Sequence, residues 1–231
     1  MNGSEQKINV ILVHGAWADG SSWNDVIGPL LSEGCNVLAA PIPLTSLSDD
    51  IAALNRILER TEGSVILAAH AYAGAVIAAT ANERIRSLVF IAALAPDEGE
   101  TVADMFYREA SHAEAPDLVP DAHGLIWFPR EAFGTAFSQH ASQQRVALLA
   151  ATQRPIALAC IQEKAPRPSW KVKPSWYLVA EDDRMINPTT QLFMAKRMAA
   201  RIRSEMVDHT PLVSAPQIVV EVILTAIAAS P

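Results

Sequence analysis

Cysteine is scarce in this sequence. The 231 residues contain only Cys35 and Cys160, which lie far apart in apolar surroundings. No CxxC pair or Cys/His spacing typical of a zinc site occurs, and the histidines of the central region (His112, His123 and His140) also lack metal-ligand spacing. We therefore expect two buried free thiols, no metal site and no cofactor that depends on one.

Basic residues are also few, since 18 Lys and Arg stand against 25 Asp and Glu, which gives a net charge of −7. This balance argues against binding to nucleic acid or to an anionic membrane, because both need a basic face. The longest apolar stretch, 65–79, contains His70, Tyr72 and Gly74 and is short for a membrane span. The first segment, MNGSEQKINV, is too polar for a signal peptide. We expect a soluble, cytoplasmic protein.

Short apolar runs alternate with helical patterns along most of the chain. The predicted strands are 8–13, 36–40, 64–69, 87–94, 175–180 and 201–207. The predicted helices begin at or near Ser22, Ser48, Ala73, Pro188 and Ser214, three of them with a serine as cap. Such alternation is typical of an α/β fold, in which a mostly parallel sheet has helices on both faces.

The alternation stops between the fourth and fifth predicted strands. Residues 97–173 contain few strand-like runs, several aromatics and scattered prolines, while 145–151 and AFGTAF have helical character. We interpret this stretch as a mostly helical lid inserted into a single domain that spans residues 1–231.

Four loops follow predicted strands and carry chemically active side chains. They are HGAW (14–17), HAYAG (70–74), EDDR (181–184) and DHT (208–210). The carboxyl ends of parallel strands meet at one edge of a sheet, so these loops are expected to lie together. A turn of small residues, a carboxylate loop and a histidine follow one another in the chain order of a hydrolase triad.

Five segments carry a family resemblance: LVHGAW, AAHAYAGAVI, LVFIAALAPDEGE, SWYLVAEDDRMINP and DHTPLVSAP. With them the chain resembles the α/β-hydrolase superfamily, and within it the small bacterial serine esterases related to plant methyl esterases and hydroxynitrile lyases. The resemblance implies an α/β-hydrolase fold with a helical lid. It also implies hydrolysis of a small carboxylic ester or lactone through an acyl-enzyme, without a cofactor.

The resemblance also assigns roles to individual residues. His209 becomes the general base, and Asp183 the acid that accepts the histidine Nδ1–H, with Asp182 as the next choice. The backbone N–H groups of Ala16 and Tyr72 become the oxyanion hole. The nucleophile position is occupied by Ala71, which has no atom that can attack a carbonyl.

Three explanations of Ala71 are open. A parental serine was replaced to stop turnover, the chain is a natural binding protein on a hydrolase scaffold, or the segment is only a buried strand running into a helix. We favour the first, because the other catalytic parts are retained. The third leaves the small residues around Tyr72 unexplained.

Aromatic side chains near the site are expected to line the substrate pocket. These are Trp17, Tyr72, Phe106, Trp127 and Phe128, with Tyr107, Phe133 and Phe137 as further candidates. Such a lining suits an apolar acyl or aryl ester as the small-molecule partner. His14 is expected to brace its loop, and His70 to point away from the site. A hydroxynitrile lyase is a weaker reading, because Lys164, Lys171 and Lys173 have no matching context.

Overall fold

The computed structural model describes residues 7–230, and its centre is a six-stranded parallel sheet. The strands are β1 (Asn9–Val13), β2 (Asn36–Ala40), β3 (Val65–His70), β4 (Ile85–Ile91), β7 (Ser175–Ala180) and β8 (Arg201–Glu205). Their order across the sheet is β2-β1-β3-β4-β7-β8. The central strands β3 and β7 are buried throughout, whereas the edge strands β2 and β8 are partly exposed. The predicted α/β class is confirmed.

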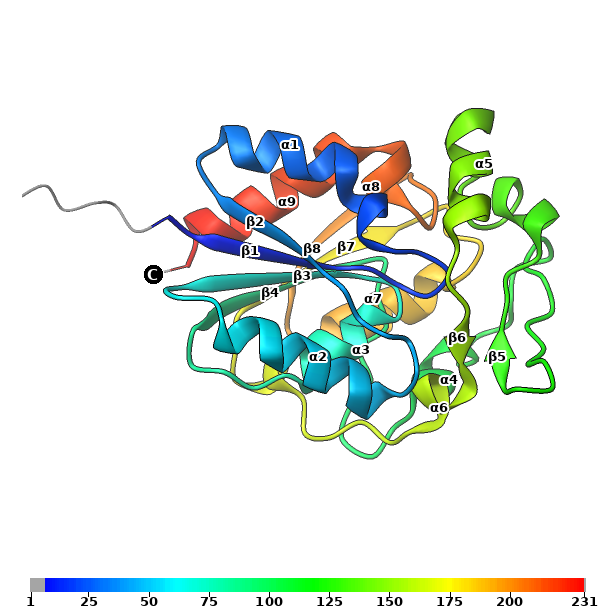
Figure 1. Cartoon of the computed structure of the whole chain (residues 1–231), viewed down its shortest axis with the longest axis horizontal. Helices are drawn as coiled ribbons and strands as arrows, with labels where there is room; N and C mark the ends of the chain where they lie inside the picture. The colour runs from blue at the N-terminus through cyan, green and yellow to red at the C-terminus, as the bar shows by residue number, and fades with distance from the viewer. Residues whose placement is uncertain (1–6, 231) are drawn as a thin grey trace, which may run out of the picture.

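Helices cover both faces of the sheet (Figure 1). One face packs against α1 (Asn24–Ser32), α8 (Pro211–Ser214) and α9 (Pro216–Ala228), and the other against α2 (Leu47–Glu59), α3 (Ala73–Ala79) and α7 (Pro188–Arg197). Because the strands are buried on both faces, they read as continuous apolar runs rather than as alternating ones. Two apolar cores result, one on each side of the sheet.

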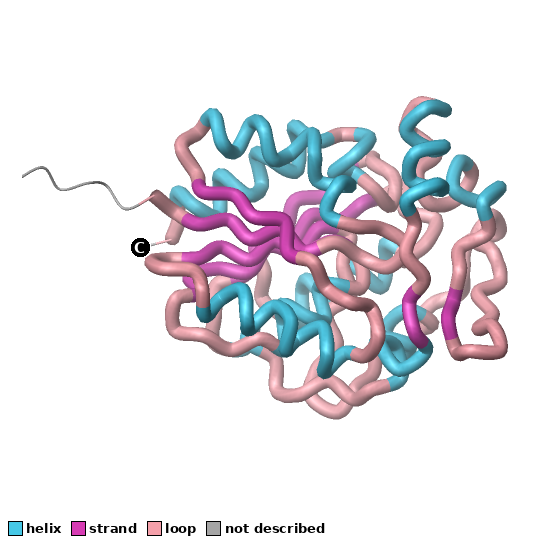
Figure 2. Tube along the Cα trace, viewed as in Figure 1, coloured by secondary structure: helices cyan, strands magenta, loops and turns pink. Residues whose placement is uncertain are grey.

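Most of the segment between β4 and β7, here called the insertion, lies beyond the carboxyl ends of the strands (Figure 2), and its last part returns past the end of α3. It contains α4 (Val102–Phe106), β5 (Leu125–Ile126), η2 (Arg130–Gly134), α5 (Gln143–Thr152), β6 (Ile156–Ala157), α6 (Leu158–Gln162) and η3 (Ser169–Lys171). Helix α5 confirms the helix predicted over 145–151. The description "mostly helical" is wrong, because AFGTAF forms part of a short 3₁₀ helix and turns, and prolines interrupt the rest.

Three predicted helix starts are also wrong. A 3₁₀ helix, η1 (Gly20–Trp23), precedes α1, and Asp19 rather than Ser22 accepts the capping hydrogen bond. Helix α2 is capped by Ser46, whose Oγ accepts from the Asp49 amide at 3.0 Å, and not by Ser48. Ser214 ends α8 instead of capping α9. Around Ser22 and Ser48 several polar residues adjoin one another, and the tertiary path of the loop selects the one that accepts the capping hydrogen bond. Helix α9 has Ala215 at its N-cap and no side-chain cap.

The parallel arrangement brings the loops after β1, β3, β7 and β8 to the same edge of the sheet. These are the four loops in which the sequence shows its polar and small-residue motifs. None of the helices within residues 7–230 combines the length and the apolar character that crossing a membrane requires.

Candidate active site

The turn between β3 and α3 holds Ala71 in a strained backbone conformation. Its φ of 50° lies in the left-handed region, which is unfavourable for a residue with a Cβ by about 1–2 kcal/mol. The turn is fixed by its own main chain, because the Ala71 carbonyl accepts from Leu94 N at 2.9 Å and Gly74 N at 3.1 Å. The Ala71 side chain lines a cavity together with the ring of His209. This is the geometry of a turn that presents its central residue to a site.

His209 and Asp183 form a buried pair next to that turn. His209 Nδ1 lies 2.9 Å from Asp183 Oδ2, and both side chains are almost completely inaccessible to solvent. A carboxylate only accepts hydrogen bonds, so Nδ1 carries the proton and Nε2 of the neutral ring has a free lone pair. Nε2 makes no hydrogen bond to any residue in the range 7–230. The ring is therefore arranged to take a proton from a group in the cavity.

Asp183 is held rigidly by three further donors. Its Oδ1 accepts from the amides of Met185 and Ile186 at 2.7 and 2.9 Å, and its Oδ2 from Gln191 Nε2 at 2.7 Å. Asp182, the alternative acid of the sequence analysis, instead lies against His140. The structure thus places Asp183, and not Asp182, against His209.

Gln191 was not identified from the sequence. It is fully buried on α7, where its Oε1 accepts from Ala180 N at 3.0 Å while its Nε2 donates to Asp183 and to the Ile186 carbonyl. A signal was present: Gln191 shares the inner face of the predicted helix with Met194 and Ala195, and a polar residue on an apolar face needs a partner.

His70 does not line the cavity, but its ring lies against the site histidine. Its Nε2 donates to the His209 carbonyl oxygen at 2.7 Å, and the two imidazole rings lie 4.8 Å apart between centroids. Burial, with a smaller contribution from His209, lowers the pKa of His70 well below 6.5. His70 is therefore a neutral group that supports the main chain of His209. His14 bonds to the Gly15 carbonyl in its own loop, at 3.0 Å.

The burial of His70 predicts how the free energy of unfolding depends on pH. The unfolded chain binds a proton on this histidine near pH 6.5, but the folded chain does not. The free energy of unfolding should therefore fall as the pH drops below 6.5, with His70 contributing up to about 1.4 kcal/mol per pH unit. Urea unfolding between pH 6.5 and 5.5 measures this slope. His70→Gln should reduce it, whereas His123→Gln, in an exposed loop, should not. An unchanged slope in His70→Gln would contradict the assignment.

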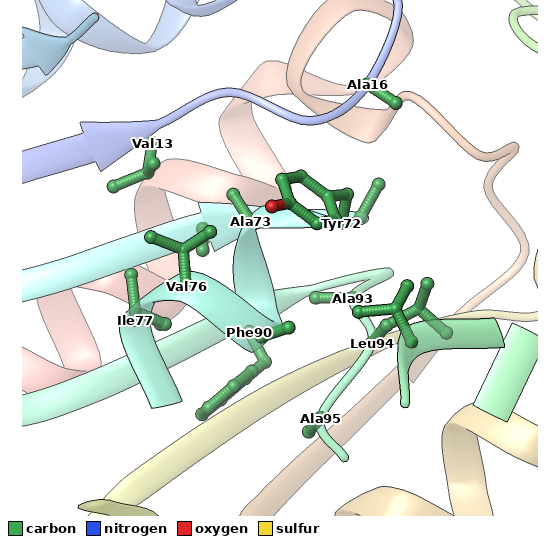
Figure 3. Packing of buried hydrophobic residues seen from close by; sticks show 14 of the residues in the cluster. Val13, Ala16, Tyr72, Ala73, Val76, Ile77, Phe90, Ala93, Leu94 and Ala95 are labelled. Carbon is green, nitrogen blue, oxygen red and sulfur yellow. The ribbon is translucent and has the colours of Figure 1, made fainter. Parts of the chain in front are cut away.

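Two backbone amides face the cavity near Ala71. Ala16 lies on the loop after β1 and Tyr72 at the turn into α3 (Figure 3). Both residues line the cavity. Neither amide donates a hydrogen bond to any part of residues 7–230, whereas the next amide, Trp17 N, donates to Arg154 O at 3.1 Å. The Ala16 N–H is thus a free donor in the loop after β1. These are the two amides that the sequence analysis names for an oxyanion hole.

The cavity is more aliphatic than the sequence suggests. Of the five predicted lining residues, Trp17, Tyr72 and Phe106 line it. Trp127 and Phe128 do not, and their assignment is wrong: the Trp127 side chain is half exposed at the surface, and the Phe128 ring packs 5.1 Å from Trp17 inside the core. The lining residues that the sequence analysis missed are Leu94, Val102, Ala103, Leu118, Ile126, Ile156, Ile161, Met185 and Ile186.

Phe133 and Phe137, two of the further candidates, also pack in the core instead of the cavity wall, while Tyr107 does line it. Side chains along a strand point to alternate faces, but side chains along a turn follow no such rule. Which aromatic residue of this region lines the cavity and which enters the core is therefore decided only when the insertion folds.

The polar end of Tyr72 is turned away from the cavity. Its hydroxyl donates to Asp50 Oδ2 at 2.7 Å, and Asp50 Oδ1 accepts from Leu44 N at 2.7 Å. Burial raises the pKa of the Asp50 carboxyl, although these hydrogen bonds oppose the shift. No pattern in the sequence indicates this contact. The Tyr72 hydroxyl is engaged with Asp50 and leaves the ring of this residue at the cavity wall.

The site contains no group of metal ligands. Within residues 7–230, no three His, Cys, Asp or Glu side chains gather closely enough to hold a metal ion. The lysines Lys164, Lys171 and Lys173 do not line the cavity either.

Comparison with known proteins gives one family match. A model described as "Alpha/beta hydrolase family" matches residues 10–222. A search of curated proteins finds no match.

Solved structures of similar fold cover almost the whole chain. Polyneuridine aldehyde esterase is 17% identical with a TM-score of 0.83, over 95% of this chain and 99% of that one. A pyrethroid hydrolase from Sphingobium faniae JZ-2 is 20% identical with a TM-score of 0.82, over 97% and 98%. The methylesterase MES16 from Arabidopsis is 18% identical with a TM-score of 0.78, over 96% and 99%. At these identities the likeness shows the fold.

Proposed function

The chain belongs to the alpha/beta hydrolase family, and on that premise we propose that it is a serine-esterase scaffold whose nucleophile position carries alanine. The proposed ligand is a small, apolar carboxylic ester or lactone. The observation that carries the proposal is the φ of 50° at Ala71, beside a cavity that it shares with His209. A strained alanine has no use of its own there, whereas a serine in the same conformation would present its Oγ to the imidazole.

The remaining residues fit this role. With a serine at position 71, His209 Nε2 would take the hydroxyl proton as the oxygen attacks the ester carbonyl, and Asp183 would stabilise the imidazolium. The amides of Ala16 and Tyr72 would donate to the oxyanion. The imidazolium would then protonate the leaving alcohol, and water would release the acid by the reverse sequence. With alanine at position 71 the first bond cannot form, so the chain binds the ester without acyl transfer.

The apolar wall points to the kind of ester. Apart from the imidazole and the two amides, the cavity is lined by aliphatic and aromatic groups and by no charged side chain. A charged acid or alcohol part would lose its hydration there without a compensating partner. Uncharged esters with short alkyl or aryl groups are therefore the expected ligands.

Direct binding tests the proposal on the chain as it is. p-Nitrophenyl butyrate should bind saturably in calorimetry, with release of nitrophenol no faster than about 10³–10⁴-fold over water, the residual rate of triad-deficient enzymes. Ala103→Trp, which fills the cavity wall, should abolish binding, whereas Ala52→Trp, on the exposed face of α2, should not. Binding that survives Ala103→Trp, or turnover at ordinary enzyme rates, would contradict the proposal.

A non-catalytic small-molecule receptor is the second candidate, and Ala71 itself favours it. Both candidates predict binding to the same cavity. They differ in the effect of a serine at position 71, which should create hydrolytic activity in the first case and not in the second.

A further inference from the structure

One turn of the insertion, residues 135–140, spans the loops that carry the buried pair. We call it the bracing turn. On the side of His209, Ser138 Oγ lies 2.6 Å from Thr210 Oγ1, and the His140 amide donates to Asp208 Oδ2 at 2.8 Å. Both partners are direct chain neighbours of His209. The turn thus holds the main chain immediately before and after the imidazole.

The bracing turn also holds the loop of the acid. Gln139 Nε2 donates to the Asp182 carbonyl oxygen at 2.6 Å, and His140 Nε2 lies 2.7 Å from Asp182 Oδ2. On the other side of Asp183, Arg184 Nη1 donates to the Thr135 carbonyl oxygen at 2.7 Å. The residues before and after Asp183 are therefore hydrogen-bonded to the bracing turn, as are the residues before and after His209.

Asp208 links the bracing turn to the loop that carries His209. Its side chain is fully buried, and it accepts from the amides of His140 and Thr210 at 2.8 and 3.1 Å and from Ser214 Oγ at 2.6 Å. No Lys, Arg or His side chain within residues 7–230 forms an ion pair with it. A buried carboxylate is costly even when its hydrogen bonds are satisfied, so a purely space-filling role does not account for it.

We propose that Asp208 is a positioning residue for His209, which acts by tying the bracing turn to the histidine loop. It touches neither the cavity nor Ala71. Its effect runs through the main chain on either side of the imidazole, and sets the direction and mobility of Nδ1 relative to Asp183. What the imidazole is used for rests on the proposed function, but the positioning itself does not.

The first experiment observes the imidazole without any reaction. In the chain labelled with ¹⁵N-histidine, the His209 Nδ1 proton should give a downfield resonance that exchanges slowly with water, because it is buried against Asp183. Asp208→Asn replaces one of the two accepting oxygens by an amide nitrogen, so either the His140 N–H or the Thr210 N–H loses its acceptor. The resonance should then exchange at least tenfold faster or broaden beyond detection. Ser138→Ala, which removes the contact to Thr210, should change it in the same direction.

The matched control also breaks a contact between the insertion and the body of the protein. Glu163 Oε2 accepts from the Ser48 amide at 2.9 Å, away from both loops. Glu163→Ala should leave the resonance unchanged. If Asp208→Asn folds and its signal is unaltered, the proposal is overturned. If Asp208→Asn does not fold, the test is made with Ser138→Ala. An unaltered His209 resonance in Ser138→Ala then overturns the proposal.

An activity measurement separates this proposal from the proposed function. In an Ala71→Ser background, Asp208→Asn should lower kcat at least tenfold and change KM less than about twofold, since the cavity wall is untouched. If Ala71→Ser is inactive while the resonance responds to Asp208→Asn, the proposed function fails and the positioning role stands. Equal losses in kcat for Asp208→Asn and Glu163→Ala would overturn the positioning role.

Discussion

The variant Ala71→Ser should hydrolyse short-chain p-nitrophenyl esters at least about 10³-fold faster than the unmodified chain, and up to about 10⁶-fold, the loss seen when a triad nucleophile is removed from a serine hydrolase. The reason is geometric. Serine at position 71 adopts the same left-handed backbone at a cost similar to that of alanine, and its Oγ then lies in the cavity beside an imidazole whose Nε2 is free.

The controls for this variant are the partners of the new hydroxyl. Adding His209→Ala to Ala71→Ser should return the rate to that of the unmodified chain, and adding Asp183→Asn should lower it by orders of magnitude, because the imidazole would lose its fixed tautomer. Stopped-flow release of nitrophenol should show a burst, the signature of an acyl-enzyme. If Ala71→Ser binds several esters but hydrolyses none, the chain is a small-molecule receptor on a hydrolase scaffold.

The second large effect concerns the packing of the turn. A Cβ on Gly74 would lie 2.5 Å from the Leu94 carbonyl oxygen and 2.8 Å from Ala93 Cβ, so α3 cannot approach the segment after β4 as it does without a glycine at this position. Gly74→Ala should lower the free energy of unfolding by about 3 kcal/mol, at the upper end of overpacking effects. Because Leu94 N also donates to the Ala71 carbonyl, the same shift should disturb the turn and weaken ester binding.

Thermal unfolding measures this change, which for a chain of this length corresponds to roughly 6–12 °C in Tm. The matched control is Gly28→Ala, on an exposed position of α1 where a Cβ meets no atom within 4 Å. It should raise the stability by about 0.5–1 kcal/mol, since alanine restricts the unfolded chain and favours helix. Equal effects in the two variants would show that Gly74 is not packed as described.

Hydrophobic periodicity was enough to predict the sheet and its helices. Runs such as ILV (11–13) and VILAA (65–69) are buried on both faces, and the strands they form differ from the predicted ranges only at their ends. The site loops were predictable for the same reason, because parallel strands deliver their carboxyl ends to one edge. The strained turn was also visible, since the small residues around Tyr72 have no purpose in an ordinary strand–helix junction.

The insertion was predicted least well. Trp127 and Phe128 are adjacent in sequence, yet one is half exposed and the other is buried in an aromatic cluster. No regular period governs this region, so the side chain that enters the core is selected by packing against Trp17 and Phe137 rather than by local pattern.

The sequence by itself determined the fold class, the order of the site loops and the residue at position 71, because each of these depends on local periodicity or on the identity of one side chain. Only the tertiary structure decided that Asp183 and not Asp182 meets His209, and that His70 supports the His209 carbonyl from 139 residues away. The same holds for Asp208, which ties the insertion to the histidine loop. These are contacts between segments distant in the chain, and their partners become neighbours only when the sheet and the insertion are assembled.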